Sequence, residues 1–447
     1  MTPGARATAA IEILERTNAR PADRVIDGYF RRRRYAGAKD RAAISAQVFG
    51  VLRRRAGLAW QIGLAAGDPE PTGEARARDL VLADVALAGS ADAIAEQFSG
   101  QGYAPPPPDT GERAWLAALA SLPPGAAPDW VAGNYPPWLD GTLRERFGAA
   151  LNPELAALNI RAPLDLRVNR LKAQRADVLA ALAGSGIEAA PSQFARDGIR
   201  LENPVRLDRH KVLTTGLAEP QDEGSQLAAL LCEAAPSHQV IDLCAGGGGK
   251  TLALAAQMEN RGQIFACDSE ARRLKKFVLR RDRAGVRNVQ TRDLGDGGEA
   301  WLATKAGAAD RVLVDAPCSG TGVWRRDPGI AWRLNEAALK THTARQARLL
   351  DTGAALVRPG GRLIYVTCSL LRCENEERAE AFLAGHPAFS LVPVANVWQA
   401  VLDSPVPLAG DMLMMTPHRT GTDGVFVATF ERRDSEPPQL DDATGAR

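Results

Sequence analysis

The sequence predicts an α/β protein that has a parallel sheet covered by helices, preceded by an all-α domain and a small α+β domain. Short β-branched runs alternate with helical runs from 216 to 430, which is typical of such a sheet. A glycine-rich turn follows the first of these strands, at 242–251. The N-terminal residues instead repeat alanine and leucine at helical spacing. We therefore expect domains at 1–128, 129–215 and 216–433 and a disordered tail at 434–447.

The helical part is predicted to be a small bundle that ends at the proline- and glycine-rich stretch 122–129, with a loop at 102–112. In one of its helices Asp40 is suited to cap the start, and the apolar positions after it fall on one face. Residues 1–60 carry 13 Lys/Arg against 5 Asp/Glu, an excess of 8. Arginine clusters of this kind suit a phosphate backbone, although a solvated helix face explains the charge equally well.

The middle part is predicted to begin with an alternating strand at 163–172, followed by an amphipathic helix that ends at a glycine and a short strand at 198–204. The strands of the large sheet are then expected in order along the chain, with helices between them, and 423–430 is expected to add an antiparallel strand. Their predicted positions are 238–244, 263–268, 288–293, 311–316 and 361–368.

Composition and termini exclude several classes of protein. The chain has 447 residues, of which 45% are hydrophobic and 24% charged, as in ordinary globular proteins. It contains no apolar run long enough to span a membrane and begins without a secretory signal, so we expect a cytoplasmic protein with no membrane partner. The six cysteines are then thiols. They form no CxxC pair and the five histidines are scattered, so no metal site is expected.

The glycine turn, DLCAGGGGKT at 242–251, matches neither common nucleotide-binding pattern. A Walker loop needs glycine where Cys244 stands, and the dinucleotide fingerprint that starts at Gly246 would need glycine at Thr251. What remains is a tight turn that lets a ligand approach the backbone. S-adenosyl-L-methionine fits, because its carboxylate can meet helix N-terminal amides. Asp268 ends the next strand, where it suits the ribose hydroxyls, and Asp293 ends the third, where it suits the adenine.

Two cysteines follow neighbouring predicted strands: Cys318 in DAPCSGTG and Cys368 in TCS. Their side chains are expected to converge on one substrate, whereas the alternative is a pair of buried structural thiols. Two thiols and S-adenosylmethionine suit methylation of carbon-5 of a pyrimidine, because a thiolate that adds to carbon-6 makes carbon-5 nucleophilic. Asp315 is placed to stabilise charge at ring nitrogen N3, and Lys250 to favour the thiolate.

These three motifs together closely resemble the RNA 5-methylcytosine methyltransferases, and the N-terminal helices look like the NusB-type RNA-binding domain of the bacterial 16S rRNA methyltransferase B subgroup. The resemblance implies a Rossmann-like methyltransferase domain that depends on S-adenosylmethionine. It makes Cys368 the nucleophile, Cys318 the residue that assists release, Asp315 the acid that contacts the base, and Lys250 a neighbour of the reacting base. The implied cofactor contacts are Cys244, Ala245, Gly246, Gly247, Gly248, Gly249, Lys250, Asp268, Asp293 and Asp315.

The resemblance covers nearly the whole chain, with one departure. The usual loop of the family is CAAPGGK, whereas this chain has CAGGGGK, with Gly246 and Gly247 in place of alanine and proline. Both changes make the loop more flexible, which weakens cofactor binding through ordering entropy. The expected partner is RNA, in particular rRNA, and the protein is expected to be a monomer. The same chemistry on tRNA remains an alternative, as does a non-catalytic RNA-binding or ribosome-assembly protein; DNA is disfavoured because the PCQ motif of DNA cytosine methyltransferases is absent.

Overall fold

The computed structural model describes residues 1–89, 91–122, 127–203 and 205–434, and the chain divides into two compact units. The first unit comprises Met1–Ala162 and Ser319–Ala338, and the second comprises Pro163–Cys318 and Leu339–Arg447. The chain therefore leaves the second unit directly after Cys318 and returns to it at Leu339. The boundaries expected at 128 and 215 fall inside these units. Half of the break expected at 122–129, and all of the tail expected at 434–447 except Asp434, lie outside the described residues.

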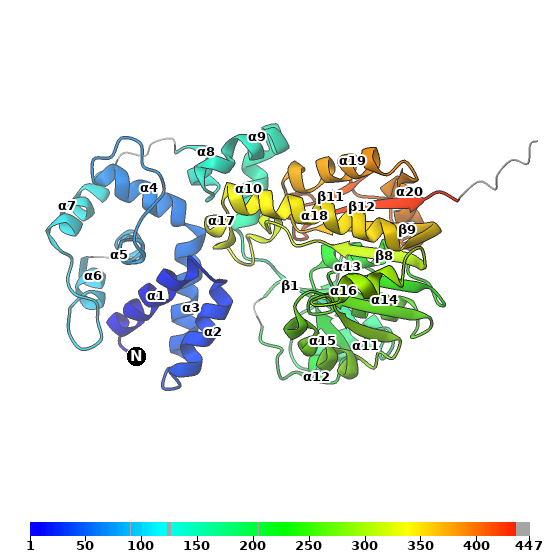
Figure 1. Cartoon of the computed structure of the whole chain (residues 1–447). Helices are drawn as coiled ribbons and strands as arrows, with labels where there is room; N and C mark the ends of the chain where they lie inside the picture. The colour runs from blue at the N-terminus through cyan, green and yellow to red at the C-terminus, as the bar shows by residue number, and fades with distance from the viewer. Residues whose placement is uncertain (90, 123–126, 204, 435–447) are drawn as a thin grey trace, which may run out of the picture. The chain divides into compact units, whose positions relative to one another are not determined.

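The first unit is helical in its described residues, and none of the helices described anywhere in the chain is long and apolar enough to cross a membrane (Figure 1). The apolar face predicted after Asp40 is buried in its core. Asp40 itself does not cap that helix, because the helix begins earlier, after Gly37, and the Asp40 carboxylate instead accepts hydrogen bonds from Arg6 and the N-terminal amine. The helices are α1 (Pro3–Thr17), α2 (Ala22–Arg32), α3 (Ala38–Arg53), α4 (Arg55–Ala65), α5 (Ala77–Ala88), α6 (Ala91–Gln97), α7 (Thr110–Leu119), α8 (Asp129–Ala132), η1 (Pro137–Leu139), α9 (Asp140–Phe147), η2 (Gly148–Ala150) and α10 (Leu151–Asn159).

The segment Ser319–Ala338 completes the first unit, although it is far away in the sequence. It contains the short helices η3 (Thr321–Val323) and α17 (Ile330–Arg333). The Arg53 guanidinium donates a hydrogen bond to the Arg325 carbonyl at 3.2 Å, and the rings of Tyr135 and Trp324 stack with their centroids 6.4 Å apart. The Arg333 guanidinium donates to the carbonyls of Thr17 and Arg20, at 3.3 and 3.4 Å.

The second unit begins with a four-stranded antiparallel sheet in the order β2-β3-β1-β4. This sheet has its own apolar core and extends past the expected boundary at 215, because β4 pairs with β1 in the register Leu166↔Pro220. Its elements are β1 (Leu164–Val168), α11 (Arg175–Ala183), β2 (Ala190–Pro191), β3 (Gly198–Leu201), α12 (Lys211–Thr214) and β4 (Ala218–Pro220).

The large sheet has eight strands, and its main path runs β10-β12-β9-β8-β5-β6-β7, with β11 paired to β12. β5 to β9 are mutually parallel, as predicted, and β12 pairs antiparallel with β9, also as predicted. The elements are α13 (Glu223–Leu230), β5 (Gln239–Asp242), α14 (Gly249–Gln257), β6 (Gln263–Asp268), α15 (Ala271–Ala284), β7 (Val289–Asp293), α16 (Gly298–Ala303), β8 (Ala309–Asp315), α18 (Glu336–Leu356), β9 (Val357–Thr367), η4 (Arg372–Glu374), α19 (Glu376–Gly385), β10 (Phe389–Val392), α20 (Val394–Val401), β11 (Leu413–Met415), α21 (Pro417–Thr420) and β12 (Val425–Arg432).

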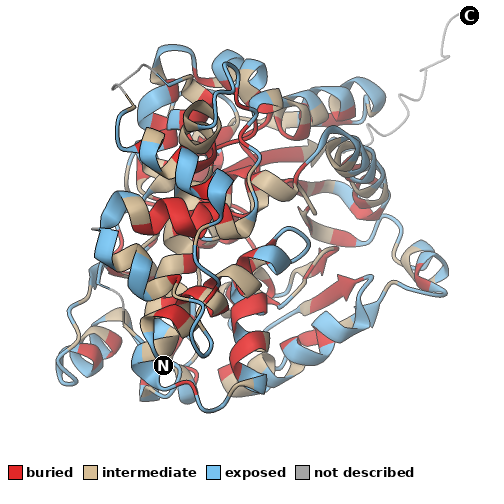
Figure 2. Cartoon of the chain, turned by 90° about the vertical axis from the view of Figure 1, so that its left-hand side faces the viewer, coloured by how far each residue is buried: buried red, intermediate tan, exposed pale blue. Residues whose placement is uncertain are grey.

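The central strands of this sheet are almost entirely buried, since helices cover both faces of a parallel sheet (Figure 2). Apolar side chains of β5, β6, β8 and β9 form one continuous core with α13, α14, α15 and α20. This arrangement directs the carboxyl ends of the parallel strands to a single edge, where ligands of open α/β sheets bind.

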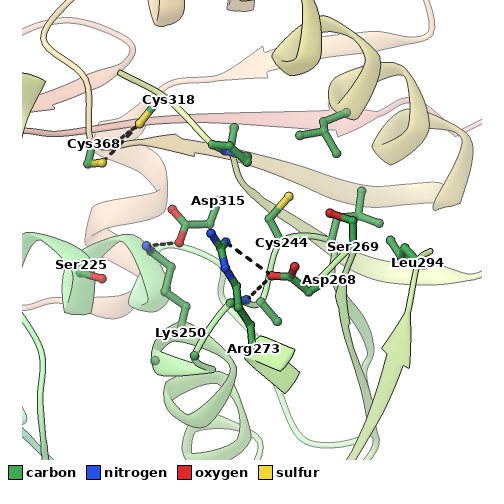
Figure 3. A pocket seen from close by; sticks show the side chains of 18 of the residues that line it. Ser225, Cys244, Lys250, Asp268, Ser269, Arg273, Leu294, Asp315, Cys318 and Cys368 are labelled. Carbon is green, nitrogen blue, oxygen red and sulfur yellow. Dashed lines mark hydrogen bonds and ion pairs between the residues drawn. The ribbon is translucent and has the colours of Figure 1, made fainter. Parts of the chain in front are cut away.

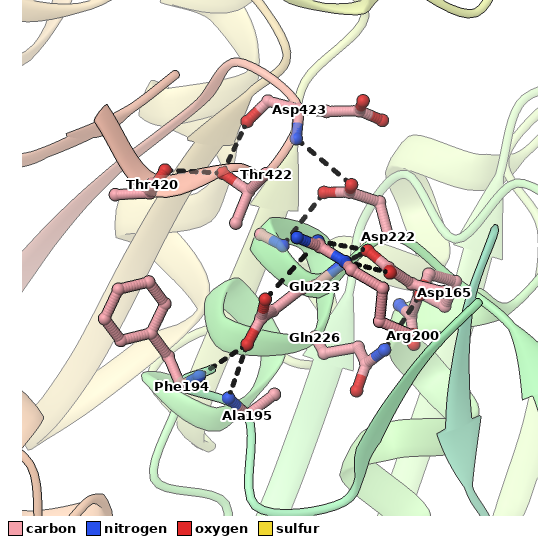
Figure 4. Close-up of polar contacts among 12 residues, drawn as sticks. Asp165, Phe194, Ala195, Arg200, Asp222, Glu223, Gln226, Thr420, Thr422 and Asp423 are labelled. Carbon is pink, nitrogen blue, oxygen red and sulfur yellow. Dashed lines mark hydrogen bonds and ion pairs between the residues drawn. The ribbon is translucent and has the colours of Figure 1, made fainter. Parts of the chain in front are cut away.

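A buried polar cluster joins the small sheet to α13 (Figure 4). The Asp165 carboxylate on β1 accepts two hydrogen bonds from the Arg200 guanidinium and one from the backbone N–H of Glu223. The Glu223 carboxylate in turn accepts the backbone N–H groups of Phe194 and Ala195. Because buried charges are stable only when they are paired and hydrogen-bonded, this cluster fixes how the small sheet packs on the start of α13.

Candidate active site

A cavity of about 700 Å³ lies at the carboxyl ends of the parallel strands in the second unit (Figure 3). No group of three or more His, Cys, Asp or Glu side chains in the described part of the chain is arranged to hold a metal ion. The cavity brings together most of the site residues that the sequence predicts. These are Cys244, Ala245, Gly246, Gly247, Gly249, Lys250, Asp268, Asp315, Cys318 and Cys368.

The two predicted thiols meet at this cavity. Cys318 follows β8 and Cys368 follows β9, and these strands are parallel neighbours. Their sulfur atoms lie 3.3 Å apart, and the Cys368 N–H points to the Cys318 sulfur at 3.3 Å. Both side chains are only half-buried, whereas Cys232 and Cys267 are buried and their burial raises the pKa of each thiol far above the usual value. The geometry therefore favours a pair of accessible thiols over structural ones.

An ion pair lies next to the thiols. The Lys250 ammonium at the start of α14 donates a hydrogen bond to the Asp315 carboxylate at the end of β8, with an N–O distance of 2.7 Å (Figure 3). Burial alone would lower the pKa of Lys250, but the negative charge of Asp315 outweighs it and the pKa is raised. The lysine side chain is 12% exposed and the aspartate 35%, so the carboxylate faces the cavity with a fixed cation behind it.

The glycine turn needs glycine for two separate reasons. Gly248 caps α14 with a φ of +78°, and a Cβ there would lie 1.8 Å from the Phe277 ring. Gly248 is thus a packing residue and does not line the cavity. Gly246, which does line it, has a φ of +56° but meets no atom closer than 3.9 Å, so its glycine serves only the backbone conformation. The turn presents bare backbone at a helix start, which suits a carboxylate-bearing ligand.

Two arginines hold the turn from outside. The Arg167 guanidinium on β1 donates a hydrogen bond of 2.6 Å to the Gly249 carbonyl, and the Arg280 guanidinium on α15 donates to the Gly247 carbonyl. Burial lowers the pKa of Arg167 to about 10, which leaves it charged at neutral pH. The small sheet therefore contributes directly to the conformation of the glycine turn.

The two predicted cofactor acids have different positions. Asp268 lines the cavity, is nearly buried, and accepts the backbone N–H groups of Gly246 at 2.9 Å and Glu270 at 2.8 Å. Asp293 does not line the cavity. Its exposed carboxylate accepts the N–H of Gly295 and so stabilises the following turn, while Leu294 lines the cavity in its place. An aspartate that ends a strand often caps the next turn, which explains the difference.

Several lining residues were not singled out from the sequence. Three follow directly after a strand end, where a search of strand-end neighbours would have found them: Gln221, Ser269 and Leu294. Ser225 lies in the first turn of α13. Others recur at helical spacing on α18, where no local signal shows which face lines the cavity: His342, Arg345 and Leu349.

The sequence of this chain matches known protein families and their members. Residues 229–431 match the family described as 16S rRNA methyltransferase RsmB/F, and residues 135–208 match the ferredoxin-like domain of RsmF/B-like methyltransferases. The probable ribosomal RNA small subunit methyltransferase B of Synechocystis sp. is 31% identical over 301 residues, which are 67% of each chain. The protein of the same description from Bacillus subtilis is 31% identical over 304 residues, again 67% of each chain.

Solved structures agree with this assignment. The protein titled PH0851 is 25% identical with a TM-score of 0.77, and the alignment covers 97% of this chain and 99% of that one. A methyltransferase homolog protein from Pyrococcus horikoshii is 26% identical with a TM-score of 0.58, covering 70% of this chain and 100% of that one. The structure titled NSun6 from P. horikoshii with SFG, at 20% identity and a TM-score of 0.59, shares the fold over 66% of this chain and 98% of its own. The chain therefore belongs to the 16S rRNA methyltransferase RsmB/F family, and it is an S-adenosylmethionine-dependent rRNA methyltransferase.

Proposed function

We propose that this protein methylates carbon-5 of a cytidine in 16S rRNA through a covalent bond between Cys368 and carbon-6 of the base. One observation carries the proposal: two accessible thiols lie 3.3 Å apart in the cavity that also holds the Lys250–Asp315 ion pair. A single nucleophile would need only one of these thiols. A paired arrangement suits a reaction in which a covalent adduct is first formed and then resolved.

The residues of the glycine turn fit S-adenosyl-L-methionine, which supplies an electrophilic methyl group when it is bound. The α14 N-terminus and the backbone of Gly246 and Gly247 would hold its carboxylate, and Asp268 its ribose hydroxyls. Each Asp268 oxygen accepts one backbone N–H and keeps a further lone pair for a hydroxyl. The cavity is large enough for a cofactor beside a base.

In the first step the Cys368 thiolate forms a bond to carbon-6, and the electron pair of the C5–C6 double bond moves toward N3. N3 then takes a proton that the Lys250 ammonium supplies through Asp315, as Lys250 passes one of its protons to the Asp315 carboxylate along their hydrogen bond. The resulting enamine makes carbon-5 nucleophilic.

Release requires the carbon-5 proton to leave. Cys318, as a thiolate, takes that proton; the electron pair of the C–H bond restores the C5–C6 double bond, and Cys368 departs with the pair of the C–S bond. The proton on N3 returns through Asp315 to Lys250, which restores the ion pair. The closeness of the two sulfur atoms supports this division of roles, because one small ring can then contact both.

The first unit supports RNA as the partner. Arg31, Arg32 and Arg34 are exposed beside Tyr35, whose side chain is 74% exposed. Arginines that surround an exposed aromatic ring can pair with phosphates while the ring stacks on an unpaired base. We propose that this unit is the NusB-like RNA-binding domain expected from the sequence and that the protein acts as a monomer.

Two cysteine variants test the mechanism. Cys368→Ala is expected to abolish both methylation and any covalent RNA adduct. Cys318→Ala is expected to trap the adduct, which appears as an RNA-shifted protein band in a denaturing gel. Methylation that persists in Cys318→Ala with no adduct would rule out the two-thiol mechanism.

The substrate and the alternatives need a separate measurement. Bisulfite sequencing of 16S rRNA from a strain that lacks the protein should reveal one cytidine that has lost its methyl group. A lost methyl group in tRNA instead would favour the tRNA alternative. Binding of S-adenosylmethionine without methyl transfer to any RNA would favour a non-catalytic assembly protein.

A further inference from the structure

A buried hydrogen-bond chain links the two turns that carry the thiols. The Gln346 side-chain amide on α18 donates to the carbonyl of Pro317, directly before Cys318, at 3.1 Å. The same amide nitrogen donates to the Glu374 carboxylate at 2.9 Å. The other oxygen of that carboxylate accepts the hydroxyl of Ser369, directly after Cys368. The chain thus runs from the residue before one thiol to the residue after the other.

Asn375 extends this hydrogen-bond network to both sequence neighbours of Cys368, Thr367 and Ser369. The Asn375 amide donates to the Ser369 carbonyl at 2.8 Å and accepts the Thr367 hydroxyl. The five polar side chains involved are fully buried: Gln346, Thr367, Ser369, Glu374 and Asn375 are each 0% exposed. Such a group is stable only in the arrangement that satisfies its members, so it tolerates little movement of either turn.

We propose that Gln346 and Glu374 are positioning residues that fix the spacing of Cys318 and Cys368. They touch neither the base nor the cofactor in this assignment; they act through Pro317 and Ser369. The inference rests on the proposed two-thiol mechanism for its catalytic consequence, but the spacing of the sulfur atoms can be measured without it.

The geometry explains why such positioning is needed. Each thiol sits in a turn beyond its strand, so the sheet register alone does not fix its side chain. The attack of Cys368 and the proton transfer to Cys318 both need reacting atoms at about 3–3.5 Å, and a displacement of about 1 Å lowers rates about a hundredfold. The hydrogen bond between Gln346 and Glu374 ties the two turns to each other. The distance between the two sulfur atoms therefore stays the same when the turns move slightly.

The test uses the full-length variants Glu374→Gln and Gln346→Leu, which nearly preserve side-chain volume. Both are expected to lower kcat on rRNA roughly ten- to a hundredfold, with KM for RNA and the affinity for S-adenosylmethionine unchanged within about threefold. Glu112→Gln is the matched control, because Glu112 is also a buried carboxylate whose two oxygens both accept hydrogen bonds, from Arg78 and Asp109, but it belongs to the first unit. The control is expected to lower the melting temperature and to leave kcat unchanged.

A second measurement reports on the spacing itself and needs no RNA. Diamide oxidises two neighbouring thiols to a disulfide and is itself reduced by the two hydrogens that they lose. The rate at which Cys318 and Cys368 become linked, followed by mass spectrometry after alkylation of the other thiols, is expected to fall several-fold in both variants and not in Glu112→Gln.

The outcomes separate the inference from the function on which it rests. Unchanged oxidation rates in folded Glu374→Gln and Gln346→Leu overturn the positioning role, and so does an unchanged kcat. If Cys368→Ala keeps full activity, the two-thiol mechanism fails, and the oxidation rates still decide whether Gln346 and Glu374 set the thiol spacing. If one variant does not fold, the other carries the test.

Discussion

At the scale of single residues, the ion pair between Lys250 and Asp315 is the most informative contact of the site. Lys250→Met keeps the length of the side chain and removes the cation. Asp315 then loses its proton source and its charge partner, so we expect kcat to fall about a hundredfold, the size expected for loss of one preorganised electrostatic group. The kcat is measured as the rate of methyl transfer to rRNA. Lys275→Met is the control, because Lys275 is an exposed lysine on α15. Equal rates in Lys250→Met and the control would contradict the role.

Asp242 gives a prediction about stability instead of catalysis. Its carboxyl is 1% exposed, and burial raises its pKa to about 7 although the Thr251 hydroxyl donates to it. In an unfolded chain the pKa is near 3.9. Between these values the folded protein binds more protons than the unfolded one, so this group makes stability fall as pH rises from about 4 to about 7. Above that window the carboxylate is fully charged and destabilises the fold by a few kcal/mol.

We therefore expect Asp242→Asn to raise the melting temperature at about pH 8 and to give little or no gain near pH 4, where the native carboxyl is already protonated. Thermal unfolding followed by circular dichroism at both pH values measures the difference. A stabilisation of equal size at both pH values, or none at about pH 8, would show that Asp242 carries no buried charge.

Most single site residues could be predicted from the sequence because their signal is local. Cys318 and Cys368 follow, and Asp315 ends, strands that are recognisable from their β-branched runs, and the parallel order of those strands fixes where they meet. The cofactor role expected of Asp293 stays a prediction, because its carboxylate does not line the cavity and accepts the N–H of Gly295. Whether a strand-end carboxylate faces the ligand or caps the next turn depends on the backbone after it, which the residue type does not determine.

At the scale of elements, the start of α14 depends on its packing against α15. Gly248→Ala would place a methyl group inside the Phe277 ring at a positive φ, so we expect a loss of several kcal/mol in the free energy of unfolding and a weaker affinity for S-adenosylmethionine. Gly246→Ala is the control. A Cβ at Gly246 would meet open space, so this variant should lose only about 1 kcal/mol of unfolding free energy, the cost of a positive φ in alanine. Similar losses in the two variants would mean that Phe277 moves aside freely.

The order of elements was predictable, but their edges were not. The run of apolar strands and amphipathic helices from 238 to 368 identified β5 to β9 and the helices α14, α15 and α18, but not the short α16. β10 and β11 are short strands, of 4 and 3 residues, and carry no periodic signal long enough to stand out. β4 is only 3 residues long, and it is a strand through its pairing with β1, which no local sequence pattern indicates.

At the scale of the whole molecule, the division into units could not be predicted from the sequence. The contacts that place Ser319–Ala338 in the first unit join residues about 190 to 320 positions apart, from Tyr135 with Trp324 to Thr17 with Arg333. No composition shift or linker marks either crossing: one directly follows Cys318, and the other, between Ala338 and Leu339, lies inside α18. A domain boundary drawn as one cut in the chain cannot describe such a unit.

This division predicts how the protein behaves after a single cut. A specific protease site introduced at the junction of residues 162 and 163 separates the chain into two pieces, but the second piece keeps Ser319–Ala338, which belongs to the first unit. We expect the nicked protein to elute as one species in size-exclusion chromatography and to separate only in denaturant. The double variant Arg53→Ala/Arg333→Ala removes three hydrogen bonds to backbone carbonyls at this packing, so its nicked fragments should separate more readily. Free separation of the nicked native protein would mean that the segment contributes no binding energy to the helical unit.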